Sequence, residues 1–124
     1  MTHKGWMHEG RALNLQAFAK RTRRNARDAA LATFDGLPLK ISRFSSHPRW
    51  EMHPAGDEVL QVIEGALELM LLQNATPLRV RLIVGELLVV PRGIWHSPMP
   101  VGEVTLLHMA NYSDTRISHE DLPA

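Results

Sequence analysis

From Leu31 onward, apolar residues recur at every second position in short runs, and this period of two is the strongest constraint on the fold. It places one side of an extended strand against a core and leaves the other side toward solvent. Gly, Pro and Asn separate the runs at short intervals. This pattern predicts an all-β sandwich or barrel rather than alternating strands and helices. The expected strands are 37–42, 59–63, 67–72, 78–84, 87–90 and 104–109.

Two segments between these runs carry turn residues. Glu64-Gly65 is expected to be a tight turn in which Gly65 takes a positive φ, and 98–102 is expected to be a second turn. Gly93, which follows Pro91-Arg92, is expected to take a positive φ as well.

The length of 124 residues fits one domain. By composition the chain divides into an N-terminal arm (1–30), a barrel with its ordered strands (31–111) and a polar C-terminal tail (112–124) expected on the surface. Periodicity leaves open whether 13–31 is a helix or an extended arm.

Composition narrows the function. The absence of cysteine excludes a disulfide scaffold, a thiolate nucleophile and a cysteine zinc site. The net charge of +1 predicts no nucleic-acid or membrane partner, and the basic cluster at 20–27 is interpreted as a solvated face. With no apolar stretch long enough to span a bilayer and no signal-peptide core, the protein is expected to be soluble and cytoplasmic.

Four residues form the candidate site: Glu51, His53, Glu58 and His96. Alternation places Glu51 and His53 on one face of a strand, and Glu58 opens the next strand. His96 lies 43 positions after His53, so only the fold can bring the two together. Two imidazoles and two carboxylates that converge inside a barrel suit a divalent ion of the Mn, Fe, Co, Ni or Zn class.

The spacing of these residues resembles the two motifs of the cupin family. The stretch from His53 through Glu58 to Gly65 is similar to the first motif, His-x-His, three or four residues, Glu, six residues, Gly. The stretch 85–96, Gly-x5-Pro-x-Gly-x2-His, matches the second motif. The resemblance, to small single-domain cupins of the cupin-2 type, covers about 31–111.

The resemblance implies a double-stranded β-helix (jelly-roll) barrel with a short N-terminal arm, one divalent transition metal per chain and a homodimer. The sequence departs from the motifs at two positions: Glu51 replaces the first histidine and Pro100 replaces an asparagine that often closes the second motif. Glu51 makes the ligand set more anionic, which favours harder or more oxidised ions. Glu51 is therefore either a fourth metal ligand or a general base, or the barrel has lost its metal.

Other histidines are given structural roles: His108 is expected in the interior or at the rim, and His47 in a loop. The leading functional hypothesis is a metal-dependent enzyme acting on a small organic molecule, such as an oxygenase, isomerase or decarboxylase. The alternative is a non-catalytic module that binds or senses a small molecule. A metal-independent epimerase is disfavoured because the metal motifs are largely intact.

Overall fold

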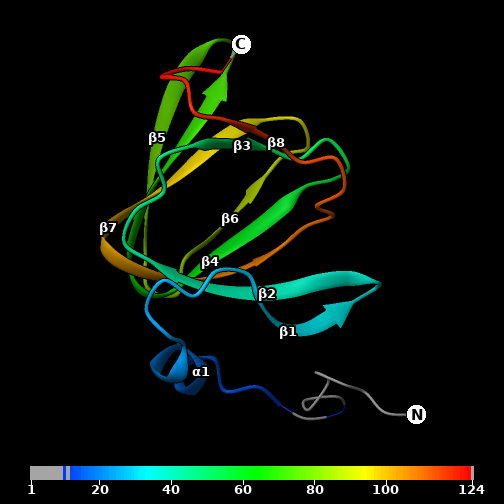
Figure 1. Ribbon diagram of the computed structural model, residues 1–124, viewed down its shortest axis with the longest axis vertical. Coiled ribbons are helices and arrows are strands. Elements are labelled where there is room, and N and C mark those ends of the chain that lie inside the picture. The colour runs from blue at the N-terminus through cyan, green and yellow to red at the C-terminus, as the bar shows by residue number, and fades with distance from the viewer. Residues whose placement is uncertain (1–9, 11, 124) are drawn as a thin grey trace.

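The computed structural model describes residues 10 and 12–123, and within this part of the chain a short helix precedes a strongly curled β-sheet (Figure 1). The prediction of an all-β jelly-roll fold is confirmed. The described elements are α1 (Leu15–Arg21), β1 (Ala29–Phe34), β2 (Leu37–Phe44), β3 (Trp50–Met52), β4 (Glu58–Gln73), β5 (Thr76–Ile83), β6 (Leu87–Val90), β7 (Trp95–Met109) and β8 (Arg116–Ser118).

The long strands β4 and β7 form the spine of the sheet. They pair antiparallel along two stretches, 59–64 with 105–109 and 66–72 with 95–101. The other edge of β4 pairs with β6 and then with β5, while β7 also pairs with β2 and β3. This double pairing rolls the sheet around its own inner face, as the ribbon shows (Figure 1).

Gly65 lies at the bend of β4, and the expectation of a turn there is wrong. The chain continues as one strand from Glu58 to Gln73, with register shifts on both sides of Glu64 that mark a bulge. The predicted positive φ is confirmed at 82°. A Cβ at this position would collide with the carbonyl oxygen of Glu103 on β7. Glycine is thus required here by close strand contact and by backbone conformation.

Two further boundaries differ from those expected, and one open question is answered. The segment 98–102 belongs to β7 and is not a turn. Strands extend beyond 31–111, because β1 begins at Ala29 and β8 pairs with β3. The open question at 13–31 is resolved by α1, which begins after Asn14, whose side chain accepts a hydrogen bond from the backbone of Ala17.

Alternation of inward-facing side chains builds the hydrophobic core between the two halves of the curl, as the period of two predicts. Its buried members are Phe44, Leu60, Val62, Leu67, Leu69, Leu71, Leu82, Val90, Val104 and Leu106. The described part of the chain contains no helix that is long and apolar enough to cross a membrane.

Candidate metal centre

The inner face of the curl holds a cavity of about 220 Å³, and all four predicted site residues line it. Glu51 lies in β3 opposite His96 of β7 in the pairing register, and His53 follows β3 directly. Glu58 is the first residue of β4. The fold therefore brings His53 and His96 together.

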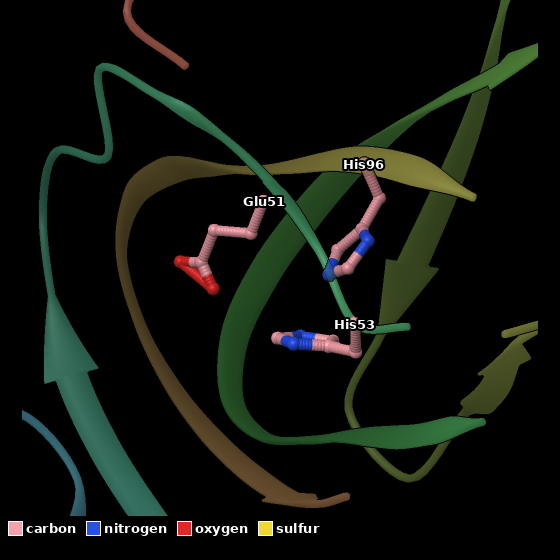
Figure 2. Close-up of side chains that lie close together, drawn as sticks. All are labelled: Glu51, His53 and His96. Atoms are coloured by element: carbon pink, nitrogen blue, oxygen red, sulfur yellow. The ribbon is translucent and has the colours of Figure 1, made fainter. Parts of the chain in front are cut away.

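Three of these side chains form a compact donor group. One donor atom from each of Glu51, His53 and His96 lies within 4.8 Å of the other two. Figure 2 shows the three side chains close together inside the curl, extending from neighbouring segments. This group could hold a metal ion.

Glu58 contacts both imidazoles. Its Oε1 lies 3.2 Å from Nε2 of His53 and 3.0 Å from Nε2 of His96. Burial alone would raise the pKa of Glu58, but the interactions with the two histidines outweigh it and hold the pKa well below its usual range. A buried, ionised carboxylate requires a cationic partner, which is either an imidazolium or a metal ion.

The hydrogen bonds of His53 identify its protonated nitrogen. Thr115 donates its only hydroxyl hydrogen to the carbonyl oxygen of Tyr112 at 2.8 Å. The same hydroxyl lies 2.8 Å from Nδ1 of His53, so it must accept that bond and Nδ1 must carry the hydrogen. In the neutral ring, Nε2 therefore presents a lone pair to Glu58.

His96 is held in the same way. Its Nδ1 lies 3.0 Å from the carbonyl oxygen of Ile94, which can only accept, so Nδ1 is the donor. Burial lowers the pKa of His96, but its hydrogen bond and charge interaction with Glu58 raise the pKa overall. Two Nε2 lone pairs facing one carboxylate oxygen would repel it, and a proton or a metal cation relieves that repulsion.

The separations between Glu58 and the two imidazoles fit either hydrogen bonds through a ring hydrogen or two ligands of one divalent ion. Metal bonds of about 2.1 Å at right angles separate neighbouring donor atoms by about 3.0 Å. The separations of 3.0 and 3.2 Å between Oε1 of Glu58 and the two Nε2 atoms agree with this value. Ligand histidines also commonly donate their second ring hydrogen to a fixed acceptor, as both do here.

Glu51 has its own set of partners. Its Oε2 lies 2.9 Å from Nε2 of His47, without hydrogen-bond alignment, and 3.4 Å from Nε of Arg49. His47 lies in the loop before β3, as predicted. Burial would raise the pKa of Glu51, but His47 and Arg49 lower it to about 2. Since both contacts within the described chain use Oε2, Oε1 can bind a cation.

A directed chain of hydrogen bonds reaches Glu58 from the opposite side. Tyr112 donates its hydroxyl hydrogen to Oε2 of Glu58 at 2.8 Å and accepts from Nδ1 of His108 at 2.8 Å. Nε2 of His108 therefore accepts from Ser42 at 2.9 Å, and Ser42 accepts from the backbone N–H of Asp28 at 2.8 Å. Burial lowers the pKa of His108, in keeping with a neutral ring.

Sequence reasoning missed part of this site. His108 is interior, as expected, but it also lines the cavity. The expectation that 112–124 lies on the surface is wrong for Tyr112 and Thr115, which are half-buried cavity residues. The only feature of the sequence that could have indicated these residues is the spacing of four positions between His108 and Tyr112, the only tyrosine of the chain. Such a spacing is a weak signal for a shared site.

Searches of sequences find no protein-family model and no curated protein that matches this chain. Solved structures do match it. A cupin-2 domain protein from Shewanella frigidimarina superposes with a TM-score of 0.70 at 22% identity, covering 80% of this chain and 93% of that one.

Two enzymes share the fold over part of their length. Oxalate oxidase in complex with the substrate analogue glycolate matches with a TM-score of 0.56 at 23% identity, over 68% of this chain and 46% of that chain. Hydroxypropylphosphonic acid epoxidase from S. wedmorenis, in complex with fosfomycin, matches with a TM-score of 0.54 at 18% identity, over 60% and 43%. The likeness at these identities concerns the fold.

Proposed function

Because this chain has the cupin fold, we propose that it is a metal-dependent enzyme that acts on a small organic molecule in its barrel. One observation carries the proposal: two histidines with fixed Nδ1 hydrogens present their Nε2 atoms to the same oxygen of Glu58. The proposed ion is one divalent transition metal per chain, of the Fe, Mn, Ni, Co or Zn class.

His53, Glu58 and His96 would hold the ion, with Thr115 and Ile94 orienting the two rings. Tyr112 occupies Oε2 of Glu58, which leaves Oε1 for the metal. When bound, the ion supplies Lewis-acid activation of an oxygen-bearing substrate. The cavity wall beside these ligands provides the space in which a small substrate is bound and shielded from water.

We propose that Glu51 is a fourth ligand rather than a general base. A pKa of about 2 leaves its carboxylate ionised at neutral pH but makes it a weak proton acceptor. Its donor oxygen also lies within 4.8 Å of donor atoms from His53 and His96. His47 and Arg49 would then act as positioning residues for Glu51.

A non-catalytic binding module remains the alternative, and one observation favours it. Every side-chain polar atom of Glu58, His108 and Tyr112 lies within 3.2 Å of a polar partner, so none is a free base within the described site. A module of this kind would bind its ligand in the same cavity without altering it. Mass spectrometry of candidate small acids incubated with metal-loaded protein distinguishes turnover from binding.

The test of the metal site is elemental analysis of the purified protein and of the double variant His53→Ala/His96→Ala. We expect about one equivalent of metal in the unaltered chain and a sharp loss in the variant. His119→Ala, which removes an exposed histidine, is the matched control. Equal metal in the double variant and the unaltered protein would refute the proposed centre.

Glu51 is tested by two substitutions. Glu51→His restores the common histidine of the first motif, so as a ligand position it should keep metal, whereas Glu51→Ala should weaken binding. If Glu51 is instead a general base, metal content stays similar in both variants, while any activity falls by about 10²–10⁴-fold.

Two further assignments are proposals. A homodimer is supported by exposed apolar residues on β5, on β6 and between them, including Ile83, Val84 and Leu87. A cytoplasmic location remains a prediction from the sequence.

A further inference from the structure

We propose that the cavity beside the metal centre binds a small organic oxyanion, a carboxylate or a phosphonate, through Lys40. This inference rests on the proposed metal-dependent function and specifies its substrate class. It is carried by the position and partners of Lys40 and by the charges that line the cavity.

Lys40 is a half-buried residue of β2 whose side chain lines the cavity. Its ammonium nitrogen lies 4.5 Å from the centroid of the Tyr112 ring. Among the ion pairs of the described residues, none includes Lys40. A cation–π contact holds such an ammonium in place without neutralising its charge, so an anion in the cavity would be its natural partner.

The other two cations of the cavity are already engaged. Arg27 donates to the carbonyl oxygen of Ser46 at 2.6 Å and lies 3.2 Å from Nδ1 of His47. Arg49 contacts Glu51 at 3.4 Å. Neither Arg27 nor Lys40 forms an ion pair with a carboxylate in the described structure, but Arg27 uses its donors on a carbonyl oxygen and an imidazole. Lys40 is thus the cavity cation that has neither a hydrogen bond nor an ion pair among the described residues, so its ammonium hydrogens are available to an anion.

The charges of the residues that line the cavity also favour an anionic ligand. Three cationic side chains, Arg27, Lys40 and Arg49, face three carboxylates. Those carboxylates are Asp28, Glu51 and Glu58. A bound divalent ion adds two positive charges, which leaves the loaded cavity cationic. A cavity of that sign concentrates and retains anions.

Tyr112 links Lys40 to the metal centre. Lys40 lies over a face of its ring, the ring of His53 lies nearly perpendicular to it (83°) at a centroid distance of 5.1 Å, and its hydroxyl donates to Glu58. Because the proposed ligands and Lys40 line the same cavity of about 220 Å³, we expect one small molecule to contact both the ion and Lys40. This arrangement matches a small organic acid that offers one oxygen to the metal and its negative charge to Lys40.

The experiment is calorimetric titration of Mn²⁺-loaded protein with glycolate, methylphosphonate and the neutral analogue glycolamide, with metal content measured in each sample. Lys40→Met should weaken glycolate binding by roughly 10-fold or more, because it removes a charged partner. Lys40→Arg keeps the charge and should retain most of the affinity. Arg79→Met, an equal charge change on the exposed side of β5, should have no effect.

Each outcome decides the proposal. Unchanged glycolate affinity in Lys40→Met, or glycolamide binding as tight as glycolate, would overturn it. The preference between glycolate and methylphosphonate assigns the oxyanion to the carboxylate or phosphonate class. If the unaltered protein takes up no metal, the proposed function fails separately. In that case Lys40-dependent glycolate binding to the metal-free chain would still support the anion site, and its absence would refute it.

Discussion

Tyr112 donates its hydroxyl hydrogen to Oε2 of Glu58 at 2.8 Å, joining two residues 54 positions apart. The other oxygen of the same carboxylate faces Nε2 of His53 and of His96. The tyrosine therefore fixes the rotation of the carboxylate and selects the oxygen that points to the two imidazoles.

The substitution Tyr112→Phe removes this donor and also the acceptor of the His108 Nδ1 hydrogen. We expect metal affinity to fall about 10–100-fold, because partners that orient ligands typically contribute that much. Unfolding free energy should fall by about 1–3 kcal/mol from the orphaned imidazole hydrogen. Competition with a chromophoric chelator and chemical denaturation measure the two effects. The control is Phe34→Leu, which alters an exposed aromatic residue on β1. Unchanged metal affinity in Tyr112→Phe would contradict the role assigned to the tyrosine.

Thr115→Val leaves Nδ1 of His53 without its acceptor. The ring is then free to change tautomer or rotate, so metal affinity should fall within about the same 10–100-fold range. Thr115→Ser keeps the hydroxyl and should restore the affinity of the unaltered protein. The same chelator competition measures both variants, and a loss of equal size in the serine variant would show that packing, not the hydrogen bond, is responsible.

The metal-free protein should lose stability in acid. The pKa of Glu51 falls from 4.5 to about 2 on folding, so its contribution is fully present above pH 4.5 and is lost as pH falls toward 2. His96 acts in the opposite direction: its raised pKa stabilises the fold below 6.5, and this contribution disappears as pH rises through the folded value.

Denaturation in the presence of a chelator measures the contribution of Glu51. Between pH 5 and pH 3, the stability advantage of the unaltered protein over Glu51→Gln should shrink by about 2 kcal/mol. Glu120→Gln, an exposed carboxylate outside the cavity, controls for net charge. Parallel pH profiles for the unaltered protein and Glu51→Gln would show that this carboxylate is not stabilised by folding.

Gly65→Ala should be strongly destabilising, by about 3 kcal/mol or more, because it combines a strained φ of 82° with a collision against the backbone of Glu103. The matched control is Gly102→Ala, where φ is 73° but the added Cβ would meet no atom within 4 Å. That control should cost only about 1–2 kcal/mol. Chemical denaturation measures the loss of unfolding free energy in both variants. Equal losses would mean that β7 can move away from β4 to make room for the added Cβ at little energetic cost.

The proposed dimer can be tested by light scattering at micromolar concentration. We expect a particle of about twice the 14.0 kDa chain mass. Leu87→Glu should shift it toward the monomer, because it places a charge among exposed apolar residues. Phe34→Glu alters an exposed apolar side chain elsewhere and should leave the mass unchanged. A 14.0 kDa particle for the unaltered protein would exclude the dimer under these conditions.

The sequence predicted the strands well where one face is buried, because alternation reports burial directly. It failed at Gly65 and at 98–102, since glycine and proline mark both turns and irregular strand positions. A bulge can be distinguished from a turn only when the partner strand is known. Here that partner is β7, which follows β4 by more than twenty residues.

The spacing of the motifs singled out His53, Glu58 and His96, and their role as metal ligands stays a prediction. The structure shows that Oε1 of Glu58 contacts Nε2 of both histidines. Tyr112, Thr115 and Lys40 could not be assigned in the same way. Each reaches the cavity because of how the sheet closes, and each stands in a local sequence that is ordinary for a strand or a polar tail. Residues that reach a site only when the sheet closes cannot be recognised from the residues next to them in the sequence.

The pairing of β4 with β7 has a consequence for the order of folding. Its contacts join residues tens of positions apart, from Leu72 with Trp95 to Val59 with Met109. Such high contact order makes closure slow, because the entropy of a long loop is lost before the contacts form. Since His53 and His96 meet only after that closure, a partly folded chain offers no tight site. We therefore expect the chain to bind its metal late in folding. Bound metal should then lower the unfolding rate more than it raises the folding rate.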